Sequence, residues 1–167
     1  MKCSACGSKN IKTQRENVPW REVTGVVVLD VAVIRCGDCG ERFEEFRALD
    51  ALLAAIAQGV VTRATRITAT DLRFLRGFLG LTGIELARAI ASSPSTVSRW
   101  EKGQQPIGLH AELLLRAMVL LHLGVKTAPQ SFATMARDTV ERSTVERVRY
   151  AYRAGKWHEQ RVEKVAA

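Results

Sequence analysis

Four cysteines, arranged in two pairs, are the residues whose types and spacing most clearly predict chemistry. Two residues separate Cys3 from Cys6 and Cys36 from Cys39, and the chain has four cysteines in all. Two C-x2-C pairs supply four thiolates, the ligand set of a closed tetrahedral zinc site. A glycine follows each pair, and glycine accepts the positive φ that turns backbone N–H groups toward the sulfurs. The pattern therefore predicts structural Zn²⁺, with no open position for a catalytic water.

Redox chemistry and uncommitted thiols are the alternative interpretations of these cysteines. A C-x-x-C pair also occurs in redox proteins, but one pair would suffice there, and a redox role needs an accessible thiolate of low pKa. The N-terminus lacks the pattern of a secretory signal, and no apolar run reaches the roughly 18 residues that a membrane span needs. We therefore expect a cytoplasmic protein without membrane contact, in which paired cysteines favour metal over disulfides.

The charge of the chain favours a polyanionic partner. The formal net charge is +8, and residues 63–126 hold nine Lys/Arg against four Asp/Glu. A basic balance of this kind suits nucleic acid, although charge alone does not define a fold. The sequence contains no Ser-His-Asp arrangement, phosphate-binding loop or carboxylate–histidine cluster. We therefore expect a binding protein rather than an enzyme.

The elements that must position these residues change in type along the chain. The segment VTGVVVLDVAVIR between the cysteine pairs is rich in β-branched residues, which predicts a small antiparallel sheet. From Leu49 the apolar period becomes helical. Gly59 is expected to end this helix, and residues 60–68 to form a linker with Arg63 and Arg66 exposed.

Caps and helix breakers divide residues 69–123 into four short helices, the third at 94–101 and the fourth at 109–123. A capping box and a proline at the first helical position are the strongest of these signals. The boundaries rest on Thr70, Gly80, Thr82 with Glu85, Ser93 with Pro94, and Gly103.

The stretch TGIELARAI, a short turn and PSTVSRWEKGQQP together resemble the helix-turn-helix domain of the Cro/cI/Xre repressor family. The resemblance covers about residues 69–123. It implies that Val97 and Trp100 anchor the third helix in the core and that this helix enters the major groove of DNA. One departure is Gly83, where the family often has a glutamine that holds a phosphate.

The resemblance implies a set of DNA-contacting side chains. Arg99 is the strongest candidate for reading bases, because arginine bonds guanine O6 and N7 bidentately. Alternatively, Arg99 is a solvated helix residue and Ser93 only a helix cap. Residues expected to face base edges are Ser93, Ser95, Thr96 and Arg99. Residues expected to contact phosphates, which position the protein without specifying sequence, are Thr82, Ser98, Lys102 and Gln104.

The two halves together resemble the MqsA (YgiT-type) antitoxin family, which joins a CxxCG/CxxCG zinc finger to an Xre-type helix-turn-helix domain. The four cysteines match the zinc ligands of that family, and VSRWEKG at 97–103 matches the end of its recognition helix. Ser95 stands where well-known members carry Asn. The resemblance implies a homodimeric repressor that binds a palindromic operator and neutralises an RNase toxin.

The expected fold class is therefore α+β, with three parts. Residues 1–62 form a β-rich zinc-binding domain, residues 63–126 an all-α helix-turn-helix domain, and residues 127–167 a basic helical extension. The extension is expected to be helical from the spacing of Val140, Val145, Val148 and Tyr152, and it exceeds the usual family ending. A longer dimer interface, DNA contact and partial disorder are the alternatives that remain open for it.

Three functions compete on the sequence. The leading hypothesis is a zinc-dependent autorepressor that serves as the antitoxin of a type II toxin-antitoxin system. The second is a zinc-containing Xre-family transcriptional regulator without a toxin partner. The third, a metal-thiol enzyme or redox switch, requires a reactive thiolate.

Overall fold

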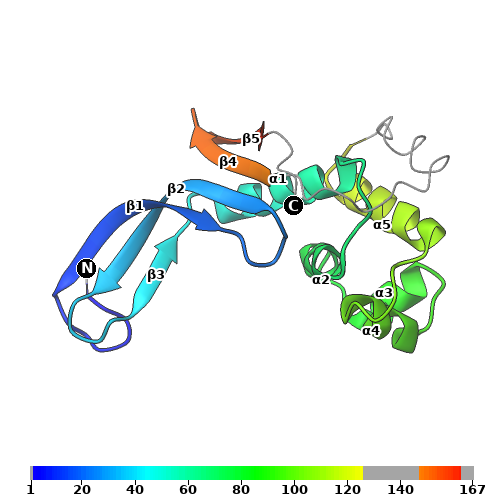
Figure 1. Ribbon diagram of the computed structural model, residues 1–167, viewed down its shortest axis with the longest axis horizontal. Helices are drawn as coiled ribbons and strands as arrows, with labels where there is room; N and C mark the ends of the chain where they lie inside the picture. The colour runs from blue at the N-terminus through cyan, green and yellow to red at the C-terminus, as the bar shows by residue number, and fades with distance from the viewer. Residues whose placement is uncertain (1, 126–146, 163–167) are drawn as a thin grey trace.

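The computed structural model describes residues 2–125 and 147–162 (Figure 1). It confirms a mixed α+β fold, built from a five-stranded sheet at one end and a group of helices at the other. One helix, α1 (Leu49–Thr62), lies between the sheet and the remaining helices.

The first three strands form an antiparallel arm that carries both cysteine pairs. These strands are β1 (Ile11–Pro19), β2 (Val26–Cys36) and β3 (Arg42–Glu45), and β2 pairs with both of the others. The sheet expected between the cysteine pairs is confirmed. A register irregularity between Glu16 and Val18 lies opposite Asp30, whose φ of 57° marks a bulge in β2.

The expected helix at the C-terminal end is wrong for residues 147–162, which form two strands. β4 (Arg147–Arg153) and β5 (Lys156–Val162) are an antiparallel hairpin, and β4 also pairs in parallel with β2. Ala154 and Gly155 have φ of 49° and 79°, the left-handed pair that a two-residue hairpin turn requires. The sequence RVRYAYR alternates between polar and apolar residues except at Ala151, and this period of two describes the segment better than the expected helical spacing. Residues 127–146 and 163–167 of that prediction lie outside the described residues.

The expected stop at Gly59 is also wrong, because α1 continues through it to Thr62. A Cβ at Gly59 would meet the hydroxyl of Tyr150 from β4 well inside 3.0 Å. Glycine therefore serves close packing between helix and hairpin rather than helix termination. Tyr150 is 1% exposed, and its hydroxyl donates to the Ala55 carbonyl at 3.2 Å.

The four helices beyond α1 follow the predicted order. They are α2 (Ala69–Phe78), α3 (Gly83–Ala89), α4 (Pro94–Glu101) and α5 (Leu109–His122). The Thr82–Glu85 capping box, the Ser93 N-cap and the bounds of α4 are confirmed. The N-cap of α2 is Thr68 rather than Thr70, because Asp71 completes a capping box with Thr68.

Residues 63–68 are not the exposed linker that we expected. The side chains of Arg63 and Arg66 are only 15% and 19% exposed, and they pair with the buried carboxylates of Asp71 and Glu112. Arg116 is fully buried on α5. Its guanidinium donates to the carbonyls of Val61, Arg63 and Thr65 and to the Glu112 carboxylate, at distances of 2.7–3.2 Å. These charged side chains therefore fix the path of the chain between α1 and α2.

A single cluster of buried apolar residues runs from the sheet into the helices. It includes Val28 and Val33 on β2, Ile56 on α1, and Leu86 and Trp100 on the helices beyond. The sheet face that carries Val28 and Tyr150 packs on α1. On the opposite face of β4 the arginines are exposed and Ala151 is buried.

Candidate metal centre and nucleic-acid interface

Each cysteine pair sits in a tight turn of the same form. Gly7 N donates to the Cys3 carbonyl at 2.9 Å, and Gly40 N donates to the Cys36 carbonyl at 3.1 Å. Gly7 and Gly40 both have φ of 74°, the left-handed conformation for which glycine is suited. The glycine of positive φ that was expected after each cysteine pair is therefore present.

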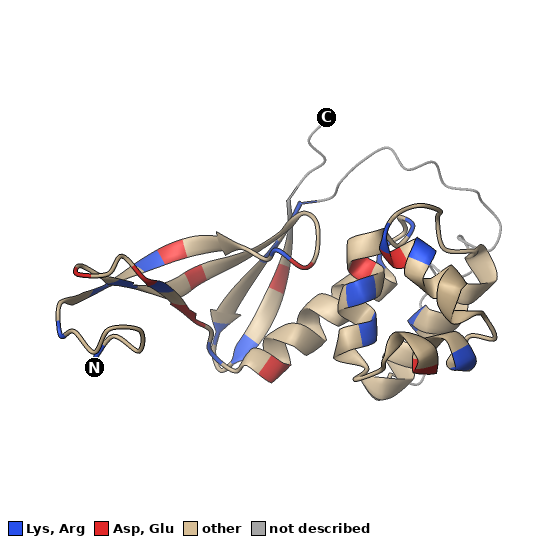
Figure 2. Ribbon diagram, turned by 90° about the horizontal axis from the view of Figure 1, so that it is seen from below, with Lys and Arg blue, Asp and Glu red and all other residues tan. Residues whose placement is uncertain are grey.

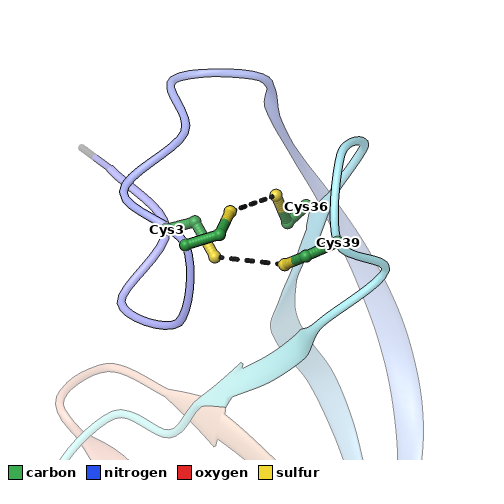
Figure 3. A group of neighbouring side chains, drawn as sticks. Cys3, Cys36 and Cys39 are labelled. Carbon is green, nitrogen blue, oxygen red and sulfur yellow. Dashed lines mark hydrogen bonds between the residues drawn. The ribbon is translucent and has the colours of Figure 1, made fainter.

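The two turns bring the four sulfurs together (Figure 3). All four Sγ atoms lie within 4.8 Å of one another, with Cys3–Cys39 at 3.7 Å and Cys6–Cys36 at 3.6 Å. A tetrahedron with Zn–S bonds of about 2.3 Å has edges of about 3.8 Å. The four thiols are free rather than disulfide-bonded. The cluster can therefore hold a metal ion, and its donor set and spacing fit the expected Zn²⁺.

Backbone N–H groups favour the thiolate form of one cysteine in the cluster. The N–H groups of Cys39 and Asp38 lower the pKa of the Cys36 thiol to about 7. At Cys39 the backbone of Glu41 acts in the same direction, but the neighbouring thiols and desolvation prevail and raise the pKa of Cys39 to about 12. Four close thiols cannot all ionise without a cation, and a bound metal supplies that charge.

A group of side chains that the sequence analysis did not single out joins the two turns. Asp38 accepts hydrogen bonds from Ser8 Oγ at 2.5 Å and from Asn10 Nδ2 at 2.7 Å. Gly37 N donates to the Asn10 carbonyl at 2.8 Å, and a Cβ at Gly37 would lie 2.5 Å from Asn10 Nδ2. The turns are thus held together by contacts that do not involve sulfur. Only the position of Asp38 between two cysteines could have suggested this.

The candidate nucleic-acid interface is built on α4. Val97 is 1% exposed and Trp100 is 7% exposed, and both belong to the buried cluster. The interpretation of Trp100 as a core residue is confirmed. Burial of this face leaves the opposite face of α4 turned outward.

The residues predicted to contact DNA lie mostly at the surface. Ser93, Ser95, Thr96 and Arg99 form one connected hydrogen-bond chain: Ser93 Oγ lies 2.9 Å from Ser95 Oγ and 2.8 Å from Thr96 Oγ1, and Arg99 Nη2 donates to Thr96 Oγ1 at 3.3 Å. The exposed members of the predicted set are Thr82, Ser93, Ser95, Arg99, Lys102 and Gln104, and the half-buried members are Thr96 and Ser98.

Two of these hydroxyl groups also cap helices. Thr82 Oγ1 accepts from the N–H of Glu85 at 3.3 Å, and Ser93 Oγ accepts from the N–H of Thr96 at 3.1 Å. The carboxylate of Glu85 accepts in turn from the N–H of Thr82 at 2.7 Å, and this contact lowers the pKa of Glu85. Thr82 and Ser93 therefore fix the starts of α3 and α4 whatever else they bind.

An ion pair that sequence reasoning missed sets the position of α4 against α2. Arg76 Nε donates to Glu101 Oε1 at 2.6 Å, and Arg76 Nη1 donates to the Leu81 carbonyl at 3.0 Å. The carboxylate of Glu101 is thus engaged by an ion pair within the protein, while the neighbouring Lys102 is exposed. No local pattern connects residues 76 and 101, because the pair depends on tertiary packing.

Comparisons with known proteins identify no relative: no family model matches the chain, and a search of curated proteins finds no match. Among the described residues, no helix combines the length and apolar character needed to cross a membrane.

Proposed function

We propose that this protein is a sequence-specific DNA-binding transcriptional repressor with a structural zinc centre, and that it serves as the antitoxin of a type II toxin-antitoxin system. The observation that carries the DNA-binding proposal is the outward polar face of α4, where Arg99 and three hydroxyl side chains are linked by hydrogen bonds. The buried Val97 and Trp100 support this face from behind.

The helix geometry suits the major groove. A recognition helix offers its N-terminal half to base edges. Ser95 and Thr96 lie in that half of α4, and Arg99 lies on the last turn of the same helix. Lys102 and Gln104 are exposed just beyond the helix, and in this proposal they contact phosphates. A repressor of this class acts as a twofold dimer on half-sites about one helical turn apart. Leu114 and Leu121, 43% and 73% exposed on α5, offer apolar surface for a second copy.

The antitoxin role rests on the resemblance of the cysteine pattern and the VSRWEKG stretch to the MqsA family. In this proposal the zinc-bearing arm contacts an RNase toxin, while α4 contacts the operator. The four-sulfur cluster supports the metal part of the proposal, because its spacing fits Zn²⁺. The alternative, a zinc-containing Xre-family regulator without a toxin partner, uses the same DNA-binding surface.

The test of DNA recognition is an Arg99→Ala variant assayed on duplexes selected by the wild-type protein from a random-sequence library. Removing a bidentate contact should weaken discrimination at one base position by about 1–3 kcal/mol, roughly 5- to 150-fold. The matched control is Arg73→Ala, which removes the same charge from an exposed site on α2. If Arg99→Ala selects the same sequences with the same affinity as wild type, α4 does not read bases.

The test of the antitoxin role is co-purification of the tagged full chain expressed with its native neighbouring genes, followed by mass spectrometry. A stoichiometric small protein that is toxic when expressed alone would support the antitoxin role. Recovery of only the homodimer and DNA would favour the regulator without a toxin.

A further inference from the structure

The β4–β5 hairpin presents a basic face on the solvent side of the sheet. Tyr150 on β4 points to α1, so the alternation of side chains along the strand turns its odd-numbered neighbours to the opposite side. Arg147, Arg149 and Arg153 are exposed on that side, and Lys156 stands directly opposite Arg153 across the hairpin.

The charges of this face are not neutralised within the described part of the chain. In the arm, by contrast, Arg35 and Arg42 are paired with Glu16 and Glu44. Both signs of charge accordingly lie along β1 to β3 in Figure 2. No carboxylate among the described residues is within ion-pair distance of Arg147, Arg149, Arg153 or Lys156.

A hollow of about 310 Å³ opens beside the basic face, where β4 separates from the bulge in β2. Its lining includes Arg153 from β4, Arg15 from β1 and the backbone bulge at Asp30. The Asp30 carboxylate is the acidic group there, and it already lies 4.0 Å from Arg15 Nη1. The hollow therefore extends the basic surface from the hairpin toward β1, with little negative charge to oppose it.

We propose that this solvent-facing side of the hairpin binds the phosphate backbone of duplex nucleic acid, without sequence preference, as a surface separate from α4. Arginines on alternate strand positions offer a row of phosphate contacts, and such contacts supply the sequence-independent part of binding. The inference goes beyond the proposed repressor function, because it concerns the sheet rather than the helices.

The aromatic side chains of the hairpin explain the choice of a duplex over a single strand. Proteins that bind single strands stack exposed bases on aromatic rings. Tyr152 and Trp157 pair across the hairpin on the side of Tyr150. The centroids of their rings lie 5.1 Å apart, and Trp157 Nε1 donates to the Arg47 carbonyl at 3.0 Å. The basic side carries Ala151, His158 and Gln160 beside its cations, with no tyrosine or tryptophan among its described residues. This composition suits a phosphate backbone better than a row of unstacked bases.

The experiment measures binding of the full chain to a mixed-sequence 30-base-pair DNA duplex as a function of salt concentration. Each phosphate contact contributes about 0.9 to the slope of log K against log salt, so Arg149→Ala combined with Arg153→Ala should reduce that slope by about 1.8. If the wild-type and variant lines meet at 1 M salt, this corresponds to up to about 60-fold weaker binding at 0.1 M. Circular dichroism establishes that the variant is folded.

Two control variants separate the hairpin from a general reduction of charge. Lys9→Ala combined with Lys12→Ala removes the same charge from exposed sites on the arm and should leave the slope near that of wild type. Arg149→Lys combined with Arg153→Lys keeps the charge and should restore the slope. An equal effect of the arm and hairpin variants would overturn the proposal. An unchanged slope, together with loss of a co-purifying acidic protein, would assign the face to a protein partner and also overturn it.

The proposal and the repressor function fail in different ways. If α4 does not read bases, no sequence is selected from the library, yet the hairpin variant still lowers the salt slope. If the hairpin does not bind phosphates, the slope is unchanged, yet Arg99→Ala still alters the selected sequence.

Discussion

Gly59 offers a direct test of how the hairpin packs on α1. Whether an alanine at this position raises or lowers the free energy of unfolding should depend on a second residue. Replacing a helical glycine by alanine normally stabilises a protein by about 1 kcal/mol. At Gly59 the new methyl group would collide with the Tyr150 hydroxyl. Displacing that hydroxyl would break its hydrogen bond to the Ala55 carbonyl, at a cost of about 1 kcal/mol, and overpacking costs about 1–3 kcal/mol more.

Gly59→Ala is therefore expected to lower the free energy of unfolding by about 1–3 kcal/mol after the helical gain is subtracted. In a Tyr150→Phe background the hydroxyl is absent. The nearest remaining atom of the ring, Cζ, is 3.6 Å from the new Cβ, an ordinary contact. The Glu159 carboxylate, 2.9 Å away, is the end of a flexible side chain and must shift to admit the methyl group. Gly59→Ala should then stabilise the protein by about 0.5–1 kcal/mol.

The assay is urea denaturation of the full chain followed by circular dichroism, with thermal melts as a second measure. A change of about 1 kcal/mol corresponds to a shift of about 2–4 °C in Tm for a chain of this size. Gly77→Ala in α2 is the matched control, because no atom lies within 4 Å of the added Cβ, and it should be stabilising in both backgrounds. A Gly59→Ala variant that is as stabilising as Gly77→Ala would refute the packing of Tyr150 on α1.

Two other predictions concern the buried charges and the cysteine turns. Arg116→Met should lower the free energy of unfolding by about 3–5 kcal/mol, because it leaves Glu112 and three backbone carbonyls without their buried donor. Denaturant unfolding measures this free energy, and a decrease below about 1 kcal/mol would contradict the prediction. Asp38→Ala should weaken zinc affinity by about 10- to 100-fold in chelator competition, because Ser8 and Asn10 lose their shared acceptor. The exposed Glu22→Ala control should leave that affinity unchanged, and equal affinities for all three proteins would rule out a positioning role for Asp38.

Local signals account for the parts of the fold that the sequence predicted well. The start of α4 follows from Ser93 and Pro94, and its end lies just before Gly103, whose φ is 70°. The four-sulfur cluster likewise follows from two short spacings, because each turn places its own two thiols. In these cases a few neighbouring residues determine the conformation, and tertiary packing does not oppose them.

The predictions from sequence were wrong where contacts with residues far away in the chain determine the local structure. Gly59 indicates a helix stop until Tyr150 is packed against it, and Arg63 is expected to be exposed until Asp71 and the helix around Arg116 surround it. The hairpin was misassigned because its valines and tyrosines fit a helical spacing as well as an alternating one. Only pairing with β2 distinguishes the two, and that contact joins segments that are far apart in sequence.

The parallel pairing of β4 with β2 has a consequence for biosynthesis. Protein chains emerge at about 5–20 residues per second, so β2 waits on the order of 10 s before β4 is made. During that interval the edge of β2 that will receive β4 has unpaired backbone groups, and such an edge can pair with other chains. The helices from α2 to α5 are complete by then and depend on contacts closer in sequence. A nascent or truncated chain would therefore carry a finished set of helices beside an unfinished sheet, and chaperones or proteases could recognise that open edge.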